Sequence, residues 1–147
     1  MTYLDQSARS SGPEVRSSRA PGEAAVIATS VVAACATWAL WVDAAGVDLE
    51  VHAGDGVRTV GIAAVALTAG IVALAGSLLA RLFARSVQGL HWWTVLAGGL
   101  WLLSMLGPLG ATSVTGGLGL ASLHLVVGAT VILGVRRVHA DRACGRA

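Results

Sequence analysis

Residues 59–80, TVGIAAVALTAGIVALAGSLLA, run for 22 residues without a single charged side chain. A helix rises about 1.5 Å per residue, so about 20 apolar residues cross the roughly 30 Å hydrocarbon core of a bilayer. A buried helix of a water-soluble protein is rarely this long without a charge. The stretch therefore predicts a transmembrane helix.

Three further apolar blocks have the same character, and the whole chain has the composition of a membrane protein. It is 55% hydrophobic and 12% charged, whereas a soluble domain carries about 25% charged residues. The four predicted spans cover residues 24–42, 59–80, 92–113 and 117–135. We therefore predict an all-α membrane protein. The short connections favour an antiparallel, up-down bundle of four transmembrane helices.

The arginines predict how this bundle is oriented. Nine of the ten arginines fall on one side of the membrane if the chain crosses it four times. The opposite side holds the acidic loop at residues 43–56, followed by the single Arg58. Because short cytoplasmic segments carry an excess of Arg and Lys, we predict that both termini are cytoplasmic and that this loop lies outside. The predicted location is a bacterial cytoplasmic membrane.

The two ends of the chain differ from the apolar centre. Residues 1–22 are rich in Ser, Arg, Gly and Pro, with little to bury, which predicts a disordered cytoplasmic tail. Residues 23–137 form the predicted transmembrane domain, and residues 138–147 a second cytoplasmic tail. Because this domain is predicted to cross the membrane, we expect the lipid bilayer to be a partner of the protein.

Small residues recur at four-residue spacing on the predicted helices, for example Ser30 with Ala34 and Gly76 with Ala80. Small residues let helix backbones approach closely in lipid, where no hydrophobic force draws helices together. These faces could pack within the bundle, against a protein partner or against a second copy in a homo-oligomer. Nucleic acid is not an expected partner, because the arginines are dispersed without an aromatic platform.

Five tryptophans help to set the depth of the spans. Trp38 and Trp41 mark the predicted outer end of the first span, and Trp92 and Trp93 the inner start of the third. Both pairs suit the aromatic belt at the membrane surface. Trp101 lies near the predicted middle of the bilayer, so we expect it to pack against a neighbouring helix.

One polar level is predicted inside the membrane. At 1.5 Å per residue, His124 and Ser104 lie about 10 Å below the outer surface, and Thr37 lies at the same depth. Pro108 has no N–H, so the Ser104 carbonyl lacks its intrahelical donor. Trp101 shares a helix face with Ser104 and Pro108. We predict that His124 donates a hydrogen bond to this carbonyl.

This polar level has two readings. His124 could join helices across a proline kink, or it could belong to a pocket for a small molecule, a proton or a haem, since an intramembrane ionisable residue is by default a site hypothesis. No Asp, Glu, Lys or Arg lies within a predicted span, which argues against a proton relay. A second intramembrane His for haem is also missing. The sequence therefore predicts no cofactor and no catalytic residue.

The outer loop offers a weak metal-site candidate. Asp48, Glu50 and His52 alternate in the sequence, so they could share one face of a short extended segment. Oxygen and imidazole groups of this kind can bind a divalent cation. A charged loop that stays out of the lipid is the simpler interpretation, and we predict no metal.

With the spans placed, the chain resembles a family of small four-pass membrane proteins of actinobacteria that is known as a domain of unknown function. The resemblance rests on Gly46–Leu49, on Ser104–Leu109 and on Ser122–Val127, and covers about residues 24–137. It implies a four-helix integral membrane protein and supplies no reaction, ligand or catalytic residue.

Two classes of function follow from the sequence. The first is a non-enzymatic accessory or helix-packing subunit, which the absence of a catalytic constellation favours. The alternative is a protein that binds or conducts a small hydrophobic molecule through an outward-facing pocket near His124. Neither class is an enzyme.

Overall fold

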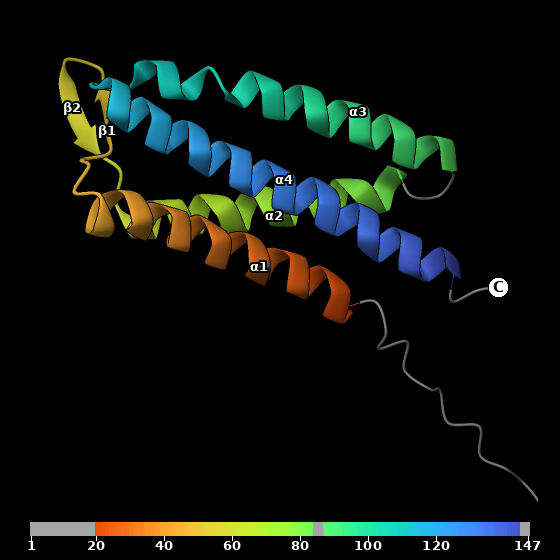
Figure 1. The fold of residues 1–147 in the computed structure, drawn as a ribbon. Helices are drawn as coiled ribbons and strands as arrows, with labels where there is room; N and C mark the ends of the chain where they lie inside the picture. Colours follow the sequence, from red (N-terminus) through yellow and green to blue (C-terminus); the bar gives the residue numbers. More distant parts are fainter. Residues whose placement is uncertain (1–19, 84–86, 145–147) are drawn as a thin grey trace, which may run out of the picture.

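The computed structural model describes residues 20–83 and 87–144. Four long helices run antiparallel to their sequence neighbours in this part of the chain: α1 Ala20–Ala39, α2 Ile62–Phe83, α3 Val87–Ser104 and α4 Val114–Cys144 (Figure 1). Each contributes a segment long and apolar enough to cross a membrane, and these segments are Gly22–Ala44, Ile62–Phe83, Gln88–Gly110 and Val114–Ala140. The fold is therefore mostly helical, with the segments that a multi-pass membrane protein requires.

Short elements close the end of the bundle where α1 is joined to α2. A π-helical turn, η1 Leu40–Ala44, is followed by two antiparallel strands, β1 Glu50–Ala53 and β2 Gly56–Thr59. Gly54 has a φ of 61°, which glycine adopts without a steric penalty and which permits the tight turn between the strands. The prediction of an all-α fold is thus wrong at this loop, where β-branched and turn residues form a hairpin.

Helices α1, α2 and α4 pack closely together. Ser30 and Ala34 of α1 and Ala73 of α2 are fully buried, each with 0% of its surface exposed. On α4, a Cβ added to Gly134 would lie 2.9 Å from a methyl carbon of Val26, so only a glycine allows this approach. Small side chains therefore bring these three helices into contact, which is one of the arrangements that the sequence leaves open.

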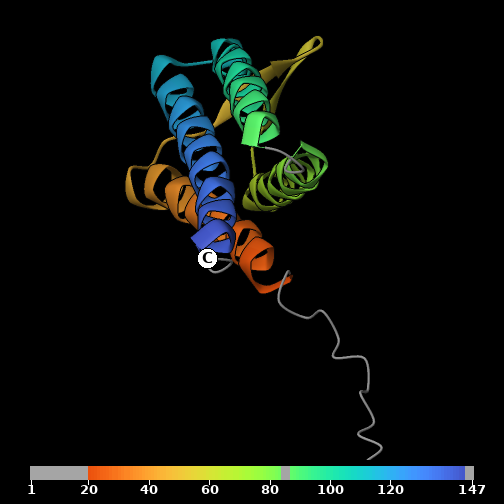
Figure 2. The same cartoon turned by 90° about the vertical axis from the view of Figure 1, so that its right-hand side faces the viewer.

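Helix α3 lies apart from α1, on the side of α2 and α4 (Figure 2). Its outward face carries Leu102 and Leu103, which are 67% and 61% exposed. In lipid, such exposure places leucine side chains against acyl chains without cost. Two tryptophans, Trp93 and Trp101, connect α3 to its neighbours.

The helix ends differ from the predicted spans in instructive ways. Helix α3 stops at Ser104, and a separate 3₁₀ turn, η2 Gly107–Gly110, follows. Pro108 cannot donate to the ladder and its ring disfavours helix at the residue before it, so it ends the helix instead of kinking it. Helix α4 continues through most of the predicted second tail.

The start of α1, the end of α2, the start of α3 and the end of α4 lie at one end of the bundle, opposite the hairpin (Figure 1). The predicted tail at residues 1–22 begins outside the described residues, and residues 20–22 belong to α1. The first apolar segment in the structure covers Gly22–Ala44 and is longer than the predicted span 24–42, so it includes Glu23 and Asp43 near its ends.

Candidate functional site

A partly open cavity of about 520 Å³ lies between α2, α3 and α4. Its walls are almost entirely apolar, and its few polar side chains include Thr68, Ser104 and His124. Val60 contributes at the hairpin side, whereas Leu79 and Ile132 lie toward the opposite end of their helices. The cavity is therefore long in the direction of the helices and polar mainly toward the hairpin.

Trp101 joins α3 to α4 at this cavity. Its Nε1 donates a hydrogen bond to the carbonyl oxygen of His124 at 2.8 Å. The indole lies on Gly128, where an added Cβ would overlap Cδ1 and Nε1 of the ring. The expected packing of Trp101 against a neighbouring helix is thus confirmed, and Gly128 provides the space for it.

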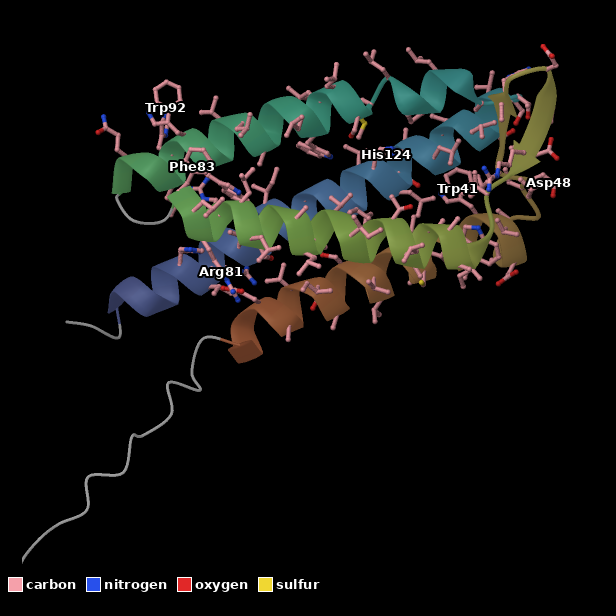
Figure 3. The ribbon with its side chains drawn as sticks, turned by 180° about the vertical axis from the view of Figure 1, so that it is seen from behind. Trp41, Asp48, Arg81, Phe83, Trp92 and His124 are labelled. Atoms are coloured by element: carbon pink, nitrogen blue, oxygen red, sulfur yellow. The ribbon has the colours of Figure 1, made fainter. Side chains whose placement is uncertain are left out.

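His124 lies on α4 between α2 and α3 and lines the cavity (Figure 3). Its Nδ1 is 2.8 Å from the carbonyl oxygen of Leu120, one turn earlier in the same helix. The predicted hydrogen bond to the Ser104 carbonyl is therefore not formed. A side chain on a helix reaches the carbonyl four residues earlier more easily than one on another helix, as the hydroxyl of Thr130 does with Val126.

Two hydroxyl side chains lie in the cavity wall with His124. Ser104 donates to the carbonyl oxygen of Trp101 at 2.7 Å, again within its own helix. Thr68 of α2 is exposed to the cavity. Sequence reasoning missed Thr68, because a depth count places residues along a helix but does not say which face they occupy.

Trp93 is the second aromatic group in the cavity wall. The prediction that it lies in the interfacial belt is wrong, because it is 0% exposed and donates to the carbonyl oxygen of Gly76 at 3.2 Å. Its neighbour Trp92 is 61% exposed and keeps the position expected for that belt. Consecutive residues on a helix face about 100° apart, so only one of the pair can point outward.

Two of the residues predicted at the polar level lie outside the cavity wall. Thr37 of α1 donates to the carbonyl oxygen of Ala33 at 2.8 Å, and Pro108 is buried in η2. The structure thus brings together three of the five predicted residues, Trp101, Ser104 and His124, and leaves Thr37 and Pro108 in structural positions.

The hairpin attaches to the turn that precedes α4. Thr112 donates its backbone N–H to the Glu50 carbonyl at 3.1 Å, and the His52 Nδ1 lies 3.3 Å from the Gly110 carbonyl. Leu49, only 1% exposed, fills the space above Gly119. These contacts close the hairpin end of the bundle.

The structure shows how the three possible metal ligands of the outer loop, Asp48, Glu50 and His52, are arranged. Glu50 and His52 alternate along β1 as predicted, whereas Asp48 precedes the strand. Within residues 20–83 and 87–144, no three His, Cys, Asp or Glu side chains are grouped so that they could hold a metal ion. The geometry of this loop therefore adds no support for a metal site.

An ion pair marks the opposite end of the bundle. The Arg81 guanidinium of α2 donates to the carboxylate of Glu23 on α1. The Glu23 residue is 8% exposed. Arg81 lies at the same end as Trp92, far from Asp48 and the hairpin (Figure 3). This pair joins two helices where they leave the apolar core, and it lies outside the cavity wall.

Comparison with known proteins identifies the family of the chain and gives no information about its activity. No curated protein and no solved structure matches the chain. The match to one family extends over residues 13–141, which includes all four helices and the hairpin. On that coverage, the chain belongs to the family of unknown function DUF6069.

Proposed function

We propose that this protein binds a small hydrophobic molecule inside the membrane, in the cavity between α2, α3 and α4. The observation that carries the proposal is the cavity itself, with its volume of about 520 Å³ and its apolar wall. Small-molecule sites generally occupy about 300 to 1,000 Å³, with mostly apolar walls and a few polar groups that fix orientation. The cavity has both properties.

The sequence favoured an accessory or helix-packing role, and the cavity now gives ligand binding the better support. Exposed leucines on α2 and α3 suit lipid as well as a protein partner, so they do not favour one occupant. We propose binding without catalysis, because His124 is the one ionisable side chain among the lining residues in the described part of the chain. A reaction generally needs several groups in defined roles.

The proposed setting is a bacterial cytoplasmic membrane with both termini in the cytoplasm. Arg81 lies in the last turn of α2, and Arg136 and Arg137 lie in the last third of α4, toward the end of the bundle where α1 begins (Figure 1). The acidic loop 43–56 lies at the other end. The positive-inside rule supports this orientation. A thiol introduced by Ala53→Cys should react with an impermeant reagent on intact cells; protection of this position with labelling of Cys144 would reverse the orientation.

Photolabelling of the purified protein in lipid nanodiscs tests ligand binding. A photoreactive alkyl diazirine should label the protein, and excess non-photoreactive analogue should suppress the labelling. Ala75→Phe places a ring in the cavity and should abolish the suppressible part. Ala63→Phe is the matched control, since Ala63 is an exposed α2 residue outside the cavity wall. Labelling that no excess of analogue reduces would contradict the proposal.

A further inference from the structure

The hydrogen bond of His124 to its own helix determines which ring nitrogen carries a proton. The Leu120 carbonyl oxygen can only accept, so Nδ1, at 2.8 Å from it, must donate. No carboxylate lies among the lining residues to pair with an imidazolium, and the wall around this part-buried ring is apolar. A neutral ring in this position carries its single proton on Nδ1.

The other ring nitrogen is then a hydrogen-bond acceptor. In a neutral imidazole with a protonated Nδ1, Nε2 carries a lone pair and no proton. This edge of the ring faces Gly107 of η2, where an added Cβ would lie 3.7 Å from Nε2. The described residues give Nε2 no hydrogen-bond partner. An acceptor is thus available beside the cavity.

The donor groups of two neighbouring residues, Ser104 and Trp101, already form hydrogen bonds within the protein. The Ser104 hydroxyl donates to the Trp101 carbonyl, and the Trp101 N–H donates to the His124 carbonyl. Ser104 Oγ therefore keeps only its accepting capacity. Thr68 is the lining hydroxyl that makes no hydrogen bond with another described residue, and it can donate or accept. The polar wall of the cavity thus accepts more readily than it donates.

We propose that the ligand is a hydrophobic alcohol or phenol whose hydroxyl group donates to Nε2 of His124. This inference rests on the proposed function and specifies the chemical class of its ligand. A hydroxyl group supplies the proton that Nε2 lacks, whereas an ether, ester or ketone offers none. The apolar body of the ligand then lies along the cavity toward Trp93 and Leu79.

Competition by two matched molecules tests the proposal. Farnesol and farnesyl methyl ether share one apolar chain and differ in the hydroxyl proton. Farnesol should suppress alkyl diazirine labelling at roughly fivefold lower concentration than the ether, the effect of about one net hydrogen bond. The variant His124→Phe, which keeps a planar ring, should remove this difference and leave competition by the ether unchanged.

The outcomes separate this inference from the proposed function. If excess analogue, alcohol and ether all fail to suppress labelling, the proposed function fails. If both competitors suppress it equally in the native protein, or if farnesol keeps its advantage in His124→Phe, ligand binding stands and the role of His124 is overturned. Should His124→Phe not fold, Gly107→Ala replaces it, because its methyl group would lie in van der Waals contact with Nε2, leave less room there for a hydroxyl group and reduce the advantage of farnesol.

Nitrogen NMR of histidine-labelled protein tests the proton position directly. The spectrum of the ligand-free protein should show His124 protonated at Nδ1 and unprotonated at Nε2, identified by comparison with His124→Phe. A proton found on Nε2 would make the ring a donor toward the cavity and would overturn the proposal.

Discussion

The two faces of the α2–α4 pair are packed in opposite ways. Toward α1, fully buried small residues such as Ala34 and Ala73 bring helices into direct contact. Toward α3, the large indoles of Trp93 and Trp101 lie between the helices, and the cavity extends around them. Small residues remove space between helices, whereas large rigid rings hold them apart. One face is therefore a structural interface, and the other is suited to a ligand.

The largest effect is expected on the closed face. Ala73→Leu adds three carbon atoms at a position with no exposed surface, and overpacking of this kind costs about 3 kcal/mol. Denaturant unfolding of the protein in detergent micelles measures the loss. Ala63→Leu, on the exposed surface of the same helix, should leave stability unchanged. Equal losses for both variants would show that the closed face is not closely packed.

A smaller effect is expected where α3 meets α4. Gly128→Ala forces the Trp101 indole off its position and breaks its hydrogen bond to the His124 carbonyl, at a cost of about 2 kcal/mol. Unfolding measures the cost, and tryptophan fluorescence should report a changed environment. Gly99→Ala is the control, because nothing lies within 4 Å of a Cβ there. A stable variant with unchanged fluorescence would contradict the packing of Trp101 on Gly128.

The smallest effect is expected on the open face. Ala75→Leu makes the same chemical change as Ala73→Leu two residues away, but its side chain enters the cavity. Its free energy of unfolding should change by less than about 1 kcal/mol, because no neighbour must move. The comparison of the two leucine variants thus measures the free space on each face. A loss as large as that of Ala73→Leu would mean that the cavity is filled by protein.

The sequence predicted those features that depend on composition and on distance along a helix. Uncharged length predicted the four helices. Depth counting placed His124 and Ser104 at one level, and both line the cavity. Features that depend on the rotation of a helix about its axis could not be predicted from the sequence. Trp93 points inward although its neighbour Trp92 points outward, because a small change in helix rotation moves either residue between lipid and core.

Local competition explains the remaining differences. His124 bonds to the Leu120 carbonyl because that oxygen is fixed one turn away, whereas an interhelical partner must be positioned by the whole fold. The alternation of Asp48, Glu50 and His52 indicated an extended segment in the outer loop, and this segment pairs with its sequence neighbour β2. Its bridge from Val51 to Ala111 was not predicted, because these residues lie far apart in the sequence.

The position of photolabel adducts tests the central claim, that the open face holds a ligand, most directly. After irradiation with the alkyl diazirine, peptide mass spectrometry should find adducts on cavity residues of α2 and α3, such as Thr68 and Ala97. Excess analogue should remove these adducts and spare those on the exposed Leu74 and Leu102. Adducts confined to such exposed leucines, with no protection anywhere, would contradict the claim.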